Sequence, residues 1–358
     1  MEHLLRKLTE IPGPSGQEGS IKETIVREAK PYCQQLWEDV LGNLIARTGP
    51  ENGYRIGILA HMDEVGLIVT RVSDRGLIGF EMIGTIDVRL LPGREVDIMA
   101  RDGKLLRGVI GNLSRHLQTA EDLAAPVSIK QLFIDTGSRS REDLLKEGVD
   151  IGSGVVFATP YHKWPNGTVL AKALDNRISC AVLIKTLEAL HGQLKKVGVY
   201  GMFTVQEEIG AKGAAVVAFD VRPNLTITLD NVPTKNPDQI SAGEVDLGCG
   251  PVIRIFDWHP ATKLGMFTHP KIKERLLKVA REEKIPHQKD VLTSTYLDSS
   301  TAHLTAGGIP GGSICFPRRY SHSPVEMSHL SDMKNGVKLL EAFVRSLEED
   351  PILFGRVY

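Results

Sequence analysis

The sequence predicts an α/β protein in which one α/β sandwich is interrupted by a small β-rich module. Apolar, strand-like runs alternate with helix-like segments near both ends of the chain. Between about residues 67 and 161, short β-like runs separated by turn residues follow one another instead. With 358 residues the chain is long enough for two domains. We therefore expect a discontinuous body over residues 1–67 and 162–358 and an insert over residues 68–161.

The body is expected to contain amphipathic helices around a central sheet. Leu4, Leu5 and Leu8 recur at helical spacing and predict a first helix, which ends before the turn-rich stretch 11–16. The run 54–60 is apolar enough to lie centrally in the sheet. The other expected elements are helices at 17–32, 211–219, 270–284 and 330–347 and strands at 43–47, 197–203, 225–229 and 309–316.

The insert differs from the body in its frequent short strands. Its β-like runs are expected at 66–70, 76–80, 94–99 and 105–110, with turns at 73–76 and 101–103. The one clear helix is expected at 140–147, where Gly148 would end it.

Composition narrows the classes of function. The 43 basic and 44 acidic residues give a net charge of −1, so we expect no general nucleic-acid or membrane-surface role. No apolar run approaches the roughly 20 residues of a membrane helix, and the amino terminus lacks the apolar core of a signal peptide. The four scattered cysteines are expected to be buried small hydrophobes, and a reducing cytoplasm is the simplest compartment.

Candidate chemistry begins just after the apolar run 54–60. His61 and Asp63 are two residues apart and would share one face of an extended segment. That spacing suits a metal-bound imidazole whose second nitrogen is held by a carboxylate. Taken alone, the pair also fits a solvent-facing loop, so it needs further ligands.

Further candidate ligands follow other strands. Asp175 lies where a β run gives way to a helix, so its carboxylate could cap that helix or bridge two cations. Glu207 and Glu208 end an otherwise apolar strand, where adjacent like charges are costly without cations or hydrogen bonds. The last two candidates, each also after an apolar strand, are Asp230 and His322.

These side chains together predict a two-metal hydrolytic site. Open α/β sheets bind ligands at the carboxyl ends of their strands, and five such ends here carry His, Asp or Glu. Two histidines and three carboxylates without thiolates suit two divalent ions, Zn or Co, with Mn also compatible. Glu207 would stay off the metals and take a proton from the attacking water.

Five segments, in this order, resemble the tetrahedral (TET) aminopeptidases, which have also been labelled glutamyl aminopeptidases or endoglucanases. They are Pro12–Gly16, Ala60–Gly66, Ala173–Arg177, Gln206–Gly210 and Tyr320–Glu326. The resemblance covers essentially the whole chain. It implies an α/β/α sandwich metallopeptidase domain interrupted by a PDZ-like dimerisation domain.

The resemblance also implies roles for the candidate residues. The equivalents of His61, Asp175 and Asp230 hold one metal ion in that family, and those of Asp175, Glu208 and His322 hold the other. Asp175 is therefore the implied bridge. Asp63 is implied to support His61 from behind, and Glu207 is the implied general base. Short peptides are the implied substrates, and twelve subunits are implied to assemble through dimers.

Two departures from the family pattern affect the site. Asn176 follows the bridging residue where some relatives carry a second acidic residue, which could alter metal affinity. Tyr296–Ser299 replaces a frequent Gly-Thr-Asp-Ala segment that lies near the substrate, so the side-chain preference is left open.

Several alternatives stay open at this level. His329 competes weakly with His322 as a ligand, His303 fits a packed helix residue, and Glu326 could orient His322 or lie on the surface. A serine hydrolase would need a Gly-x-Ser-x-Gly motif, which is absent. Adjacent Glu207 and Glu208 suit a glycosidase poorly, because its two carboxyl groups must flank the sugar bond at about 5–9 Å. A binding protein that had lost catalysis should lack Glu207 or a ligand.

Overall fold

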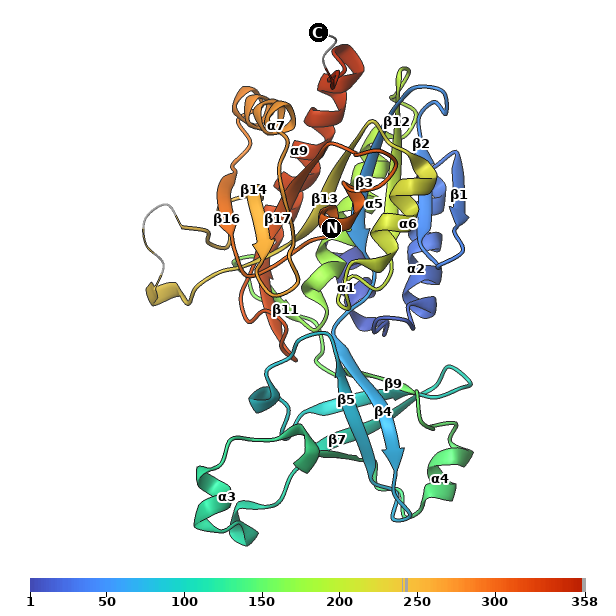
Figure 1. Cartoon of the computed structure of the whole chain (residues 1–358), viewed down its shortest axis with the longest axis vertical. Helices are drawn as coiled ribbons and strands as arrows, with labels where there is room; N and C mark the ends of the chain where they lie inside the picture. Colours follow the sequence, from blue (N-terminus) through green and yellow to red (C-terminus); the bar gives the residue numbers. More distant parts are fainter. Residues whose placement is uncertain (240, 242–243, 356–358) are drawn as a thin grey trace.

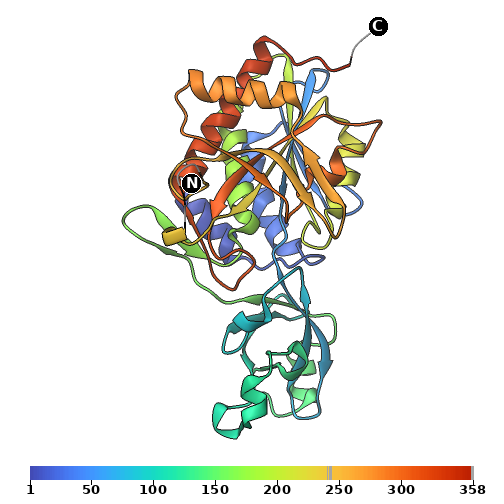
Figure 2. The same ribbon diagram turned by 60° about the vertical axis from the view of Figure 1, so that its left-hand side comes forward.

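The computed structural model describes residues 1–239, 241 and 244–355. Figure 1 shows a large body of helices around a sheet, with a smaller β-rich part below it along the long axis. The two parts lie end to end in Figure 2 as well. The mixed α/β class predicted from the sequence is therefore confirmed.

The body is built on a nine-stranded sheet with the order β1-β2-β12-β3-β13-β17-β14-β15, and β16 pairs with β14. Its centre is parallel, because β3 lies between β12 and β13 and runs in the same direction as both, as does β17 beside β13. The strands are β1 (Gln35–Glu38), β2 (Leu44–Thr48), β3 (Tyr54–His61), β12 (Val197–Thr204), β13 (Leu225–Pro233), β14 (Val252–His259), β15 (Leu264–Phe267), β16 (Gln288–Leu292) and β17 (Gly311–Arg318).

Helices cover both faces of this sheet because its central strands are apolar on both sides. On β3, Ile58 packs in the core beneath α5 (Leu174–Leu190), whereas Leu59 packs with α6 (Lys212–Val221) on the opposite face. The first face also carries α1 (Glu2–Glu10), α2 (Gly19–Ala29), α7 (Pro270–Glu282) and α9 (Leu330–Glu349), and the second carries α8 (Ser299–Ala302).

The smaller part is a closed barrel with the strand order β4-β5-β8-β7-β6-β9. Its strands are β4 (Gly66–Val72), β5 (Ile78–Ile83), β6 (Glu95–Met99), β7 (Leu105–Gly111), β8 (Phe133–Asp135) and β9 (Gly154–Phe157). The alternation along β6 buries Val96 and Ile98 in a core of its own. The short helices α3 (Ala120–Ala124) and α4 (Arg141–Lys146) flank the barrel, and Ser140 caps α4.

Most expected elements are present, with differences that have physical causes. The insert contains α3 in addition to the expected helix, and the strands β14 to β16 were missed. No residue of β16 is buried, so its sequence carries little of the apolar pattern that marks a strand. The β run expected before Asp175 is β11 (Thr168–Ala171), but its small sheet with β10 (His162–Lys163) and β18 (Glu326–His329) was missed.

The expectations about membrane-spanning segments and about the cysteines can also be compared with the structure. Among the described residues, no helix is both long and apolar enough to cross a membrane. All four cysteines are free. Cys180 and Cys315 are buried as expected, but Cys33 is only partly buried and Cys249 is exposed, so the expectation of four buried cysteines was wrong.

Candidate metal centre

The five candidate ligands converge at one edge of the central sheet. His61 is the last residue of β3, Asp230 lies near the end of β13, and Glu208 follows β12. These three strands run parallel, so their ends meet at the same edge. Asp175 does not cap α5 as the simpler interpretation allowed. It has an extended backbone at a kink in the first turn of that helix, and its side chain faces the cluster.

Asp175 lies between the two histidines. Its Oδ1 is 3.3 Å from Nε2 of His61, and its Oδ2 is 3.4 Å from Nε2 of His322. Asp230 Oδ1 lies 4.0 Å from the same His61 nitrogen, and Glu208 Oε2 lies 3.4 Å from the same His322 nitrogen. Two groups of potential ligand atoms result, and Asp175 belongs to both.

The raised pKa values of Glu208 and Asp230 show that their anionic forms are costly here unless cations lie nearby. Burial, followed by the charge of Asp175, raises the pKa of Glu208 to about 7 and that of Asp230 to about 8. Glu208 Oε1 is buried without a hydrogen-bond partner among the described residues. Anionic oxygens gathered in a buried place are costly unless cations compensate them, so this donor set fits two divalent ions.

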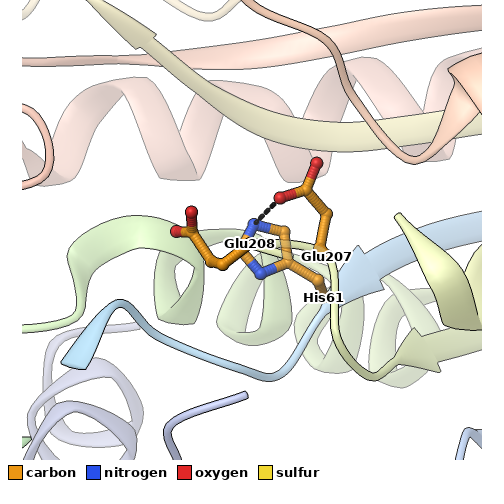
Figure 3. Close-up of side chains that lie close together, drawn as sticks. All are labelled: His61, Glu207 and Glu208. Atoms are coloured by element: carbon orange, nitrogen blue, oxygen red, sulfur yellow. Dashed lines mark ion pairs between the residues drawn. The ribbon is translucent and has the colours of Figure 1, made fainter. Parts of the chain in front are cut away.

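Glu207 faces the same His61 nitrogen as Asp175 and Asp230. Its Oε2 lies 3.9 Å from His61 Nε2, and Figure 3 shows the Glu207 carboxyl group facing that ring while the carboxyl group of Glu208 points away from it. Burial raises the pKa of Glu207 well above its usual value, with Asp230 and Glu208 adding to the effect. His61, Glu207 and Glu208 form a third group of potential ligand atoms, so geometry alone does not separate a base from a ligand.

Asp63 holds several parts of the cluster together. Its Oδ1 is 3.3 Å from Nδ1 of His61, on the side opposite the ligand nitrogen, as the spacing predicted. The same carboxylate accepts the backbone N–H groups of Glu207 at 3.0 Å and Glu208 at 3.1 Å, and the Ser15 hydroxyl at 2.6 Å. Burial raises the pKa of Asp63, but hydrogen bonding to His61 and these donors outweighs it and lowers the pKa.

A second buried carboxylate, that of Glu326, positions the backbone of Asp175 and His322. Glu326 accepts the backbone N–H groups of Asp175 at 2.9 Å and His322 at 3.1 Å, and it pairs with Arg318. Arg318 in turn lies 2.8 Å from Asp175 Oδ2. Glu326 is only 1% exposed, so the surface interpretation was wrong, and it holds the His322 backbone instead of its imidazole. Arg318 was missed, although its place directly after an apolar strand gave a signal.

The imidazole of His322 is oriented from the barrel side of the molecule. Its Nδ1–H donates to the Thr85 carbonyl at 3.0 Å, which leaves Nε2 free toward Asp175 and Glu208. The insert was expected to carry no catalytic side chain, and its contribution here is a backbone oxygen. His329 instead contacts the Asn166 carbonyl and Ser331, and none of the candidate metal groups among the described residues includes it.

Comparison with known proteins assigns the family. The family model described as M42 glutamyl aminopeptidase matches residues 42–339. This chain belongs to the M42 glutamyl aminopeptidase family. It is therefore a peptide hydrolase of the aminopeptidase type, and the resemblance to the TET aminopeptidases is confirmed.

Solved structures and curated relatives agree with this assignment across the chain. Aminopeptidase APDkam598 from the archaeon Desulfurococcus kamchatkensis is 35% identical with a TM-score of 0.89, covering 96% of this chain and 93% of that one. The TET1 peptidase of Pyrococcus horikoshii, which can assemble into a tetrahedron or a large octahedral shell, is 33% identical with a TM-score of 0.85, covering 95% and 98%. The lysyl aminopeptidase of Pyrococcus furiosus is 28% identical over 96% of this chain and 97% of its own.

The M42 site opens into a cleft of about 340 Å³ beside the ligands. Tyr296, in the departing segment, lines this cleft, whereas Asp298 is buried beneath it and accepts a hydrogen bond from Thr204. The other departure, Asn176, is fully buried. Its Nδ2 donates to the Leu229 carbonyl at 2.9 Å and its Oδ1 accepts from Asn231 at 3.0 Å, so it joins the backbone next to Asp175 to β13.

Proposed function

We propose that this M42 enzyme is a dinuclear metal-dependent aminopeptidase that removes single residues from the free amino termini of short peptides. The observation that carries the proposal is the place of Asp175, whose two oxygens face two separate histidine nitrogens at 3.3 and 3.4 Å. One carboxylate in that position can bridge two ions. The oxygen and nitrogen donors suit Zn or Co, and Mn is also compatible.

In this proposal each ion has three protein ligands. His61, Asp175 and Asp230 hold one ion, and Asp175, Glu208 and His322 hold the other, as two of the three observed groups allow. When bound, the ions supply Lewis acidity toward the peptide carbonyl and a more acidic water.

Glu207 supplies the proton transfers of the proposed reaction. Its carboxylate takes a proton from the water that attacks the scissile carbonyl, and it then returns a proton to the leaving amine nitrogen. Asp63 fixes the backbone of Glu207 and the ring of His61, so that both side chains keep their positions during the reaction. Burial raises the pKa of Glu207 above its ordinary value, and perturbed carboxyl groups of this kind gather at catalytic sites.

We further propose the division into a catalytic domain over residues 1–67 and 162–358 and a PDZ-like dimerisation domain over 68–161. The closed barrel with its own core supports this division. Assembly through dimers into a dodecamer is supported by the related structure PhTET1-12s, which is a dodecamer in the asymmetric unit. The four free cysteines are consistent with a cytoplasmic location.

The Glu207→Gln variant tests the mechanism. It keeps the shape of the side chain, so it should retain both ions while turnover falls by about 100-fold or more, as expected for a lost general base. Glu208→Gln is the matched control one residue away, and it should lose metal as well as activity. Elemental analysis and initial rates on one peptide decide the matter. Full activity of a metal-loaded Glu207→Gln protein would refute its assignment as the base.

The reaction class is tested on a peptide of mixed sequence followed over time by mass spectrometry. Stepwise loss from the amino end is expected, and an acetylated copy of the same peptide should remain intact. Internal fragments, or loss from the carboxyl end, would contradict the proposal.

A further inference from the structure

The cleft beside the candidate metal centre has a second wall that contributes no metal ligand. Pro233 from the end of β13, His259 from the end of β14, Leu292 from the end of β16 and the segment 294–296 form this wall. An enzyme that removes one amino-terminal residue must hold that residue's side chain next to the scissile bond. If the proposed aminopeptidase function holds, on which this inference rests, the second wall is the surface that the side chain meets.

The second wall offers no fixed charge to a substrate side chain. Among the described residues that line the cleft, Arg318 alone carries a full charge outside the candidate ligands and Glu207. It is 2% exposed and already engaged by Asp175 and Glu326. It is therefore not available as a partner for an incoming carboxylate.

His259 presents an aromatic ring to the cleft. Its Nδ1 accepts the backbone N–H of Thr262 at 3.2 Å, so the ring hydrogen is carried by Nε2. The ammonium of Lys263, in the same hairpin, lies 5.3 Å from the centre of the Trp258 ring and is held there. The hairpin thus brings the His259 imidazole to the cleft, whereas the neighbouring Lys263 ammonium lies over the Trp258 ring.

Tyr296 completes the aromatic part of the wall. Its ring centre lies 6.1 Å from that of His259, and the two planes are nearly perpendicular, which is a favourable edge-to-face arrangement. Burial, with Glu207 and Glu208 adding to it, raises the pKa of the Tyr296 phenol. The wall therefore combines two aromatic rings with apolar area from Leu292 and Pro233, and Ser294 and Thr295 add hydroxyl groups but no Lys, Arg, Asp or Glu side chain.

We propose that this pocket selects uncharged apolar or aromatic amino-terminal residues, such as leucine, methionine and phenylalanine, over glutamate, aspartate, lysine and arginine. A charged side chain would lose its hydration here without gaining a partner, whereas an apolar one gains contact area with two rings. Family membership does not fix this preference. The matching family model is described as glutamyl, and the Pyrococcus furiosus relative is named lysyl.

The test compares four dipeptides that differ only in the amino-terminal residue: Leu, Phe, Glu and Lys, each followed by Ala. With the metal-loaded enzyme, kcat/KM for Leu and Phe should exceed that for Glu and Lys by at least about tenfold. Calorimetric binding of the four corresponding amino-acid amides to Glu207→Gln gives a readout that does not depend on turnover, and it should rank them in the same order.

Variants locate the preference on the second wall. His259→Asp adds a carboxylate, and it should raise kcat/KM for Lys relative to Leu by about tenfold or more. If His259→Asp fails to fold, Thr295→Asp on the same wall replaces it, and it should raise kcat/KM for Lys relative to Leu in the same way. Ala261→Asp is the matched control, because it adds the same charge at an exposed position of the same hairpin and should leave the ranking unchanged.

The outcomes separate this inference from the proposed function. Preference of the wild-type enzyme for Glu or Lys would overturn the inference while leaving an aminopeptidase in place. An unchanged ranking in a folded wall variant would overturn the assignment of this surface. Failure to release the amino-terminal residue from any of the four dipeptides would instead contradict the proposed function.

Discussion

Replacing Asp63 by Asn should weaken the metal centre without any change to a proposed ligand. Asp63 is fully buried, and its two oxygens serve different partners. Oδ1 faces His61 Nδ1 and the Glu207 N–H, whereas Oδ2 accepts from Ser15 and the Glu208 N–H. An Asn side chain keeps the shape but has only one oxygen, so one of these two sides loses its acceptor.

The loss of free energy depends on which way the new amide group points. The orientation with the amide nitrogen toward Ser15 costs less, because the Ser15 hydroxyl can turn and accept a hydrogen bond from it. Only the Glu208 N–H then loses its acceptor. One unsatisfied buried donor costs about 1–3 kcal/mol of folding stability. His61 keeps an acceptor in this arrangement, but a neutral one. We therefore expect a further 10–100-fold loss in metal affinity, which is about 1.4–2.7 kcal/mol.

The assay separates stability from metal binding with a matched control. Asp332 is also fully buried and accepts two backbone N–H groups, from Gly248 and Gly250, both at 2.7 Å, but none of the candidate metal groups in the described part of the chain includes it. Asp332→Asn should lose stability in thermal unfolding while its affinity for Zn, titrated against a competing chelator, stays that of the wild type. Wild-type affinity in Asp63→Asn would refute the reasoning, and so would an equal loss of affinity in Asp332→Asn.

Three further predictions concern metal and assembly. Asp175→Ala should weaken both sites, whereas His61→Ala and His322→Ala should each chiefly empty one; an Asp175→Ala protein that retains two ions after dialysis would exclude the bridge. Chelation should abolish activity and lower the unfolding temperature, since ions that bind only the native state stabilise it, and added Co or Zn should restore both. Light scattering should give a mass near twelve chains, with dimers as the intermediate, and a fully active monomer would argue against the proposed assembly.

The sequence could predict the convergence of the candidate ligands because local patterns determine it. An apolar run such as 54–60 specifies a buried parallel strand, and the residue that follows it lies at the ligand-binding edge. His61, Glu208 and Asp230 each follow or end such a run, so their meeting needed no knowledge of the helices between them. His322 and Asp175 were found from strand ends in the same way, although both lie in irregular backbone; their assignment to particular ions came only from the family motifs.

Asp63 was predicted to support His61 because it lies only two positions away, but the other supporting contacts could not be predicted because their partners are distant in the chain. Ser15 reaches Asp63 across 48 positions, and Glu326 reaches the Asp175 backbone across 151. No periodicity encodes such pairs. A serine in a turn and a glutamate after a proline are both common on surfaces, and only tertiary packing shows that these two are buried acceptors or donors at the site.

The barrel is joined to the candidate metal centre more closely than an inserted domain requires. The Gln17 side chain donates to the Gly152 carbonyl and accepts from the Gly154 N–H, and the Thr159 hydroxyl donates to the Pro324 carbonyl two residues from His322. The Thr85 carbonyl then sets which nitrogen His322 presents to Asp175 and Glu208. A domain proposed for assembly thus supplies one of the contacts that orient a proposed ligand, so the geometry of the site depends on the joint between the two parts of the chain.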